Sequence, residues 1–181
     1  MTGTQLAQRE DQAALSAAER LWTEEQRDAI RKQLVPQGTR VTDADLALFG
    51  MVCERAGLDP FLRQAYLIPT REGPKIHIGI DGLRLIAARD GGVDSTDGPF
   101  WCDTSGRWVD VWLSDAPPMA AKYGVRRRGA QGFTYAVALY REFKGQGPNW
   151  TQRPAHQLAV VAERHALRKA FQHEIGGVVR T

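Results

Sequence analysis

The sequence predicts an α+β fold in which antiparallel β-hairpins pack with helices and a long basic helix comes last. The first observation is the order of patterns: two helices, a hairpin, a third helix, four more strands and a final helix. Successive strands joined by tight turns favour antiparallel pairing. The second observation is size, because 181 residues with 43% hydrophobic side chains suffice for one domain with a sizeable core.

Two capped helices open this pattern. The letters TEEQ, from Thr23 to Gln26, form a capping box that predicts a helix to about Leu34. Thr42 is the expected N-cap of the second helix, and Gly57 fits the position just after its end.

The N-terminal residues, the apolar runs and the cysteines indicate how the chain divides into domains and in which cellular compartment it is expected. We expect residues 1–22 to form a helix or a flexible arm and residues 23–181 to form a single domain. No run of about 18 apolar residues could span a membrane, and the first letters, MTGTQLAQREDQ, lack the apolar segment of a secretion signal. Cys53 and Cys102 have no metal-binding spacing, so a cytoplasmic protein with reduced thiols is expected.

The stretch HIGIDGLRLIAARDGG, residues 77–92, could be a nucleotide site or scaffold. A phosphate cradle needs a Gly-rich turn at a helix start, but the glycine spacing of a dinucleotide site and the Gly-Lys-Ser/Thr of a P-loop are both missing. Asp81 is better interpreted as the N-cap of a scaffold helix over about 82–90. Arg84 lies off its apolar face and is expected to be free to face a ligand. Three residues are expected in the core: Leu83, Ile86 and Ala87.

The remaining elements are strands and one helix. The runs QAYLIPT and KIHIGI flank a Gly-Pro turn and predict a hairpin, and FWCDTSGRWVDVWL predicts a second one turning at 104–106. Two further strands are expected at 120–128 and 133–143. The last helix starts at Pro154, a good first residue, and runs to about Phe171.

Charge is unevenly divided along the chain. Residues 1–60 hold 7 Lys and Arg against 10 Asp and Glu, whereas residues 122–181 hold 11 against 3. An acidic front and a basic back suggest a polyanionic partner for the back. The alternative is a solvated basic face without a partner.

The final helix concentrates this charge. At the helical repeat, Arg153, Gln157, Arg164 and Arg168 fall on one stripe, while Glu163 lies away from it. Most of the opposite side is small and apolar: Ala155, Leu158, Ala159, Ala162 and Ala166. Guanidinium groups without nearby acids fit a phosphate backbone better than an intrahelical salt-bridge ladder, with an ordinary solvated face as the alternative.

Other positive charges lie on or near strands. At most two of the consecutive residues Arg126, Arg127 and Arg128 can share one face of a strand. The five tryptophans could stack on bases or, more commonly for aromatic residues in strands, fill the core. The predicted contacts to DNA are Arg63, Arg71, Lys75, Arg84, Lys122, Arg126, Arg127, Arg128, Arg153, Gln157, Arg164, Arg168 and Lys169.

The sequence contains few patterns typical of catalytic residues. The four histidines, His77, His156, His165 and His173, lack the spacing of metal ligands. The alternative function is a metal-dependent DNA nuclease, because Glu142 and Lys144, downstream of Asp115, faintly resemble the acid-x-Lys hairpin of such enzymes.

Four segments resemble the phage Bet proteins of the Red-beta/RecT group of single-strand annealing proteins. They are CERAGLDPFLRQAYLIP, GIDGLRLIAAR, GPFWCDTSGRWVDVWLSDAPPMAA and PAHQLAVVAERHALRKAFQHEIGG, in the family's order over roughly residues 43–178. Arg63 and Arg168 match basic positions of the family, whereas Ala155 and Val161 stand where its last helix has further basic residues.

The resemblance implies a non-enzymatic protein of homologous recombination in the cytoplasm of a bacterial host. Such a protein binds single-stranded DNA and the annealed duplex, works without ATP and assembles with copies of itself into rings or helical filaments. No cofactor is expected, and Mg²⁺ as an aid to annealing is left open. Family members reach a phage exonuclease or a host single-strand-binding protein through a C-terminal region, which we expect this chain to lack.

Overall fold

The structure is a computed structural model that describes residues 22–36, 39–89 and 92–176. It is an α+β structure with antiparallel sheets and several helices, as the sequence predicts. The chain divides into two compact units, called here the N-terminal unit, Met1–Gly82, and the C-terminal unit, Leu83–Arg180. The single domain expected over 23–181 stays a prediction, and the arm expected at 1–22 lies, apart from Trp22, outside the described residues.

The N-terminal unit begins with the helix that the TEEQ motif predicts. In α2, Glu24–Ala29, the Thr23 hydroxyl accepts a hydrogen bond of 3.2 Å from the backbone N–H of Gln26. The N–H of Thr23 donates in return to the Gln26 side-chain oxygen at 2.9 Å, which completes the capping box. The chain continues as a π-helical turn, η1, Ile30–Leu34, so the predicted end near Leu34 is confirmed.

The second helix, α3, Asp43–Ala56, is capped at both ends as expected. The Asp45 N–H donates to the Thr42 hydroxyl at 3.2 Å, and the Thr42 N–H donates to the Asp45 carboxylate at 2.8 Å. Gly57 closes the helix with a φ of 57°, a left-handed conformation that a residue without a Cβ adopts at little cost. The buried face supplies core residues of this unit: Leu46, Ala47, Phe49 and Cys53.

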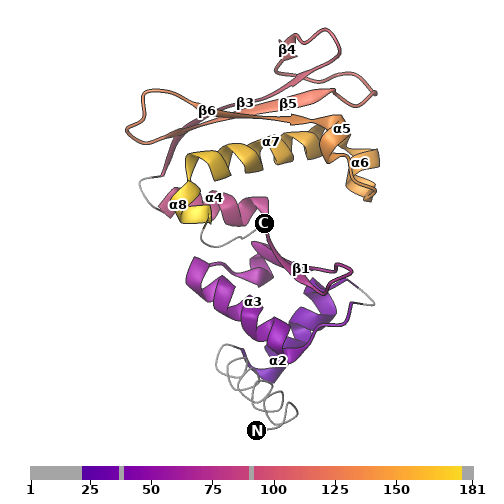
Figure 1. Cartoon of the computed structure of the whole chain (residues 1–181), viewed down its shortest axis with the longest axis vertical. Coiled ribbons are helices and arrows are strands. Elements are labelled where there is room, and N and C mark those ends of the chain that lie inside the picture. The colour runs from indigo at the N-terminus through magenta and orange to yellow at the C-terminus, as the bar shows by residue number, and fades with distance from the viewer. Residues whose placement is uncertain (1–21, 37–38, 90–91, 177–181) are drawn as a thin grey trace. The chain divides into compact units, whose positions relative to one another are not determined.

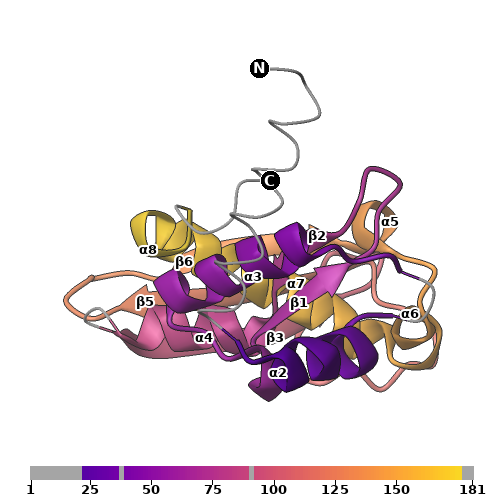
Figure 2. The same ribbon diagram turned by 90° about the horizontal axis from the view of Figure 1, so that it is seen from below.

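A two-stranded hairpin completes the N-terminal unit and confirms the first predicted strand pair. A short 3₁₀ helix, η2, Pro60–Leu62, leads into it. β1, Ala65–Ile68, pairs antiparallel with β2, Lys75–Ile78. Figures 1 and 2 show the hairpin and the two helices of this unit from two directions.

The third helix, α4, Ile80–Arg89, begins earlier than predicted and holds Asp81 inside its first turn. The prediction that Asp81 is the N-cap is therefore wrong. The start of the helix is instead packed on backbone: a Cβ on Gly79 would lie 2.9 Å from the carbonyl oxygen of Arg63, and one on Gly82 only 2.3 Å from that of Gln64. The two glycines thus permit close packing of the chain on itself.

The rest of α4 follows the predicted pattern. Its apolar face is buried, with at most 6% of any of these side chains exposed: Leu83, Ile86 and Ala87. None of the helices in the described parts of the chain is long and apolar enough to cross a membrane.

The C-terminal unit is built on a four-stranded antiparallel sheet with the order β4-β3-β5-β6. The strands are β3, Val93–Cys102, β4, Trp108–Val109, β5, Ala120–Arg127, and β6, Thr134–Leu139. The pairing of β3 with β4 confirms the second predicted hairpin.

The strand expected at 133–143 ends before its predicted limit. Leu139 pairs with Ala120, the first residue of β5, so later residues have no strand to pair with. The Tyr140 N–H donates to the Met119 carbonyl at 2.9 Å, and the chain then forms a short helix, α5, Tyr140–Phe143.

Helices follow the last strand, and one of them covers a single face of the sheet. They are α6, Pro148–Gln152, α7, Pro154–Ala170, and α8, Gln172–Gly176, and α7 has the predicted bounds within one residue. Figure 1 shows α7 along one face of the sheet, with no helix of this unit on the other. Four fully buried side chains form the contact: Ala121, Ala138, Leu158 and Ala162. The uncovered side is called here the outer face.

Candidate nucleic-acid interface

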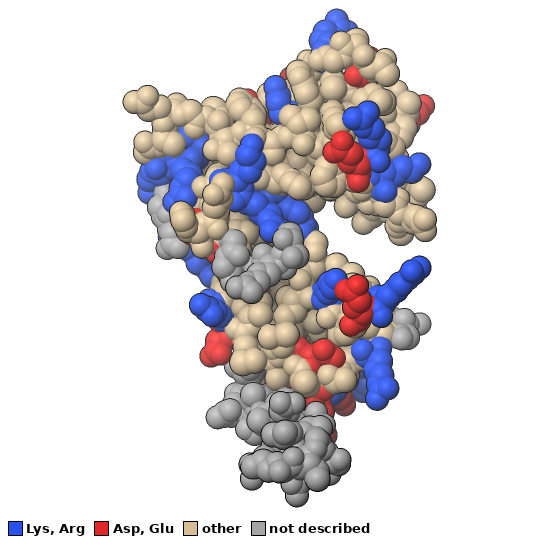
Figure 3. All heavy atoms as spheres, in the orientation of Figure 1, with Lys and Arg blue, Asp and Glu red and all other residues tan. Residues whose placement is uncertain are grey.

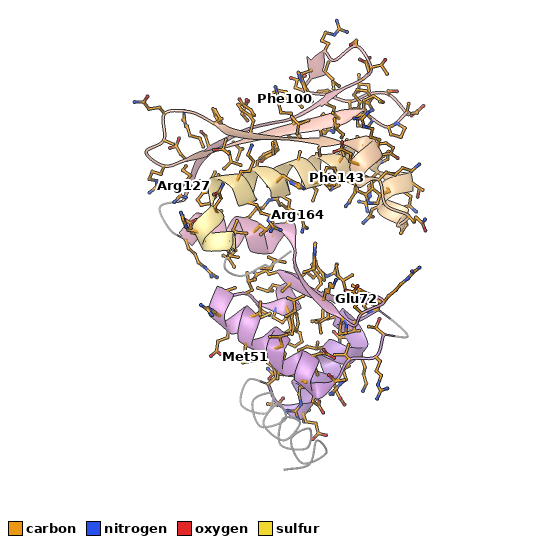
Figure 4. The ribbon with its side chains drawn as sticks, in the orientation of Figure 1. Met51, Glu72, Phe100, Arg127, Phe143 and Arg164 are labelled. Carbon is orange, nitrogen blue, oxygen red and sulfur yellow. The ribbon has the colours of Figure 1, made fainter. Side chains whose placement is uncertain are left out.

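Packing of α7 on the sheet decides where its arginines point. The buried side of the helix is lined by small residues and leucines, including Leu158, Ala162 and Ala166, each 0% exposed. Small side chains let helix and sheet backbones approach closely, which fixes the rotation of the helix. Arg164 consequently lies on the side of α7 away from the sheet (Figure 4), and in the same region of Figure 3 Lys and Arg gather with few acids among them.

Glu163, the acid of α7, is already neutralised. It is 7% exposed and accepts two hydrogen bonds of 2.7 Å from the Nε and Nη2 atoms of Arg84. Such a bidentate pair is strong and geometrically specific. Arg84 is therefore ion-paired, which helical periodicity cannot reveal because the partner is 79 positions away. Its side chain remains 52% exposed, and its contact with a ligand stays a prediction.

The arginines that remain on α7 repel one another. Burial, and then the charge of Arg168, lower the pKa of Arg164. Burial, then Arg168 and Arg164, also lower the pKa of His165, whose ring meets Phe143 edge-on with centroids 5.1 Å apart. Within the described residues, neither Arg164 nor Arg168 forms an ion pair. Half-buried guanidinium groups without carboxylates are chemically suited to hold an anion such as phosphate.

The other predicted DNA contacts of α7 lie in separate environments along the helix. Arg153 stands at the N-cap of α7, exposed, and contacts the Asn149 side chain at 3.3 Å. Gln157 is half-buried one turn later. Lys169 is exposed, and its Nζ donates to the backbone carbonyl of Tyr135 at 2.9 Å. Their role in DNA binding stays a prediction.

The consecutive arginines at the end of β5 separate, as strand alternation requires. Arg126 pairs with Asp94 at 2.7 Å and lies over the ring of Phe133. Arg127 points to the other side, where Figure 4 shows it near α7 and α8. It pairs with Glu174 at 2.7 Å and donates to the Ala170 carbonyl at 2.9 Å. Arg128, just beyond the strand, is exposed.

Lys122 has an environment that sequence reasoning missed. Its ammonium nitrogen lies 5.1, 4.9 and 5.4 Å from the ring centroids of Phe100, Trp108 and Tyr135. These rings come from three different strands. Alternation could have placed Lys122 and Arg126 on one face, but only the register of the sheet shows which rings surround the lysine.

Three predicted contacts belong to the N-terminal unit. Arg63 is exposed and adopts a φ of 60°, unusual for a residue with a Cβ. Arg71 is exposed in the hairpin turn, and Lys75 pairs with Glu72 at 2.9 Å. Their contact with DNA stays a prediction.

The tryptophans divide between packing and surface. Trp101 donates its indole N–H to the Ala155 carbonyl at 2.9 Å and packs on the α7 contact, as does Trp150. Trp108 stands on the outer face beside Lys122. Trp22 packs against Phe49, and Trp112 donates to the Ala116 carbonyl within its loop.

The residues of the nuclease alternative do not form the hairpin that suggested it. Glu142 lies in α5 rather than in a strand, and the Lys144 ammonium lies 5.8 Å from the ring of Tyr140. Asp115 is exposed in the loop before β5. Within residues 22–36, 39–89 and 92–176, no three His, Cys, Asp or Glu residues are grouped so as to hold a metal ion.

Comparison with known proteins matches the chain to the RecT family over residues 20–181. The chain belongs to the RecT family. The match covers both units, and it makes this a DNA-binding, single-strand annealing protein of phage-type recombination. No curated protein matches the sequence. The RecT-family match agrees with the resemblance that the four sequence segments carry, and it places the Arg164–Arg168 pair in a protein whose ligand is a polyanion.

Proposed function

We propose that this RecT-family chain anneals complementary DNA strands without ATP, with the Arg164–Arg168 pair of α7 contacting the phosphate backbone. The observation that carries the proposal is this pair of neighbouring arginines. Burial and then the charge of Arg168 lower the pKa of Arg164, and no carboxylate among the described residues pairs with either arginine. An incoming phosphate relieves the repulsion and replaces counterions held in solution.

The mechanism that follows is non-covalent. Arginines that hold phosphates leave the bases of the bound strand exposed, so that a second strand can test Watson–Crick pairing. Because phosphates carry no base information, binding is independent of sequence. Neither ATP nor a catalytic residue is needed for this exchange, and Mg²⁺ would act at most as a counterion for the paired strands.

We also propose that the active form is a ring or a helical filament. A head-to-tail contact between unlike surfaces of neighbouring copies generates such assemblies. The charge difference between residues 1–60 and residues 122–181 supports it, because an acidic surface of one copy can meet a basic surface of the next. We propose in addition that the protein works in the cytoplasm of the bacterial host. Its further partners would be a phage exonuclease and a host single-strand-binding protein.

The test replaces Arg168 with Ala and measures affinity for single-stranded DNA across salt concentrations. Loss of one phosphate contact should reduce the slope of log affinity against log salt by roughly one unit, equally for different DNA sequences. Arg55→Ala is the matched control, because Arg55 is, like Arg168, an arginine in the last turn of a helix, and it is exposed and is not a predicted contact. It should leave the slope unchanged.

Two outcomes would contradict the proposal. One is an unchanged salt slope for Arg168→Ala together with a lower melting temperature, which would make Arg168 a structural residue. The other comes from incubating labelled complementary strands with the protein and Mg²⁺. Strands converted intact to duplex without ATP agree with annealing, whereas shortened strands would favour the nuclease alternative of Asp115, Glu142 and Lys144.

A further inference from the structure

The outer face of the sheet carries aromatic rings and cations side by side. Across the strands, Phe100 of β3 stands beside Lys122 of β5, and Gly124 of β5 stands beside Tyr135 of β6. Trp108 of β4 adds a further ring. Figure 4 shows Phe100 projecting on the side of the sheet away from α7. This face is therefore separate from the Arg164–Arg168 pair of the same unit.

Tyr135 lies flat against the sheet because its neighbour is a glycine. A Cβ on Gly124 would come within 2.6, 2.9 and 3.1 Å of three atoms of the Tyr135 ring. The ring thus covers the backbone of Gly124, and its hydroxyl donates across β5 to the Asp97 carboxylate, which pairs with Gly124 on the far side. The side chain remains 39% exposed. The ring thus rests on the sheet and remains partly open to solvent.

One cation lies beside this ring, and a second lies beside the neighbouring ring of Phe133. The Lys122 ammonium lies 5.4 Å from its centroid and forms no ion pair with any residue in the described ranges. On the other side the Phe133 ring lies 5.8 Å from that of Tyr135, with Arg126 5.2 Å from the Phe133 centroid. Asp94 forms an ion pair with Arg126. Of these two cations, Lys122 is therefore the one whose charge can bind a phosphate.

From this arrangement we infer that the outer face binds single-stranded DNA through its bases, with one base stacked on Tyr135 and a phosphate held by Lys122. An exposed flat ring beside a cation is the combination by which proteins hold unpaired strands without reading sequence. Annealed duplex is excluded from this site, because its bases are stacked on one another. The inference rests on the proposed function and adds to it a base-contacting surface distinct from the phosphate contacts of α7.

The test compares two strands of equal length and charge. One is a thymidine oligonucleotide, and the other has the same number of phosphates but abasic residues. Tyr135→Leu should weaken binding of the thymidine strand by roughly tenfold and leave binding of the abasic strand unchanged. Tyr135→Phe keeps the ring and is the matched control, expected to bind both strands as the unchanged protein does. Arg168→Ala should weaken both strands alike.

Each outcome separates the two proposals. Equal affinities of Tyr135→Leu and the unchanged protein for the thymidine strand would overturn the base site and leave the α7 proposal standing. The same holds if Tyr135→Leu weakens binding of both strands equally. It also holds if the substitution alters only self-association in sedimentation, which would make the outer face a contact between copies of the protein. Binding of neither strand by the unchanged protein would overturn the proposed function itself.

A second measurement needs no substitution, so it stands even if Tyr135→Leu fails to fold. The unchanged protein is irradiated with a strand containing 5-iododeoxyuridine and then digested with trypsin. A base stacked on Tyr135 should crosslink within the tryptic peptide 129–141, at residue 135. Crosslinks confined to peptides with no residue of the outer face would overturn the inference.

Discussion

At the scale of single residues, the buried carboxylate of α7 is engaged by an arginine of another helix. Glu163 is neutralised by Arg84, so the acid that the sequence places between the arginines of α7 does not compete with phosphate for Arg164 or Arg168. Its burial at 7% exposure also makes it a structural residue. A structural residue and the residues proposed to bind DNA therefore occupy neighbouring positions of one helix.

Replacing Glu163 with Ala should lower the free energy of unfolding by about 2 kcal/mol, because hydrogen bonds to a charged group are lost and a buried space opens. Denaturant unfolding measures the change. Glu142→Ala is the control: that carboxylate is more than half exposed and should change the free energy by less than about 0.5 kcal/mol. A loss for Glu163→Ala no larger than that of Glu142→Ala would contradict a structural role for the pair.

His165 should make stability depend on pH. Its pKa in the folded protein is lowered from 6.5 by burial and by Arg168 and Arg164, so the unfolded chain binds a proton more readily. Stability should therefore fall as pH drops through about 6.5 and level off below the lowered pKa. Urea unfolding between about pH 8 and pH 5 tests this. His165→Gln should remove that part of the pH dependence, and an unchanged profile would show that His165 does not cause it.

At the scale of elements, the sheet has two faces with different chemistry. The α7 face is packed with small apolar residues such as Ala121 and Ala138, which bring the helix close. The outer face carries rings and cations around Lys122. Strand alternation produces this division, because neighbouring residues of β5 point to opposite sides. Arg127 illustrates this division: its side chain projects from the α7 face of the sheet and links β5 to α8 through an ion pair with Glu174.

Gly124→Ala tests whether the Tyr135 ring depends on the missing Cβ. A methyl group at this position would lie 2.6 Å from the ring, so the ring must move, and we expect a loss of about 1–3 kcal/mol in the free energy of unfolding. In a Tyr135→Ala background the same substitution should cost much less, because no ring remains to be displaced. Equal losses in both backgrounds, measured by denaturant unfolding, would show that the cost arises from the backbone.

At the scale of the whole molecule, charge is divided along the chain. The front, residues 1–60, carries more acids than bases, and the back, residues 122–181, carries 11 Lys and Arg against 3 acids. This division supports both proposals made for the molecule, a polyanionic ligand for the basic part and head-to-tail contact between copies.

Self-association should therefore weaken as salt rises, because screening reduces the attraction between exposed charges. Sedimentation velocity with single-stranded DNA at low salt should show assemblies far larger than one chain, and these should shrink as salt is added. A sample that remains monomeric with DNA at low salt would contradict the assembly proposal.

Local sequence determined the ends of several elements of this protein. Capping at Thr23 and Thr42, the glycine after α3 and the start of α7 at Pro154 were all predictable, because each depends on residues within a few positions of one another. The sequence also determined the charge stripe of α7 and carried the resemblance to the RecT family.

Tertiary structure decided which side chains the site can use. Arg84 and Arg127 find their acids 79 and 47 positions away, and Tyr135 lies over Gly124 only because β5 and β6 pair in one register. No local pattern contains such distances, since pairing of distant segments depends on how the sheet and α7 pack. The sequence therefore determined where positive charge accumulates, and the fold decided that Arg84 and Arg127 are ion-paired whereas Arg164, Arg168 and Lys122 form no ion pair among the described residues.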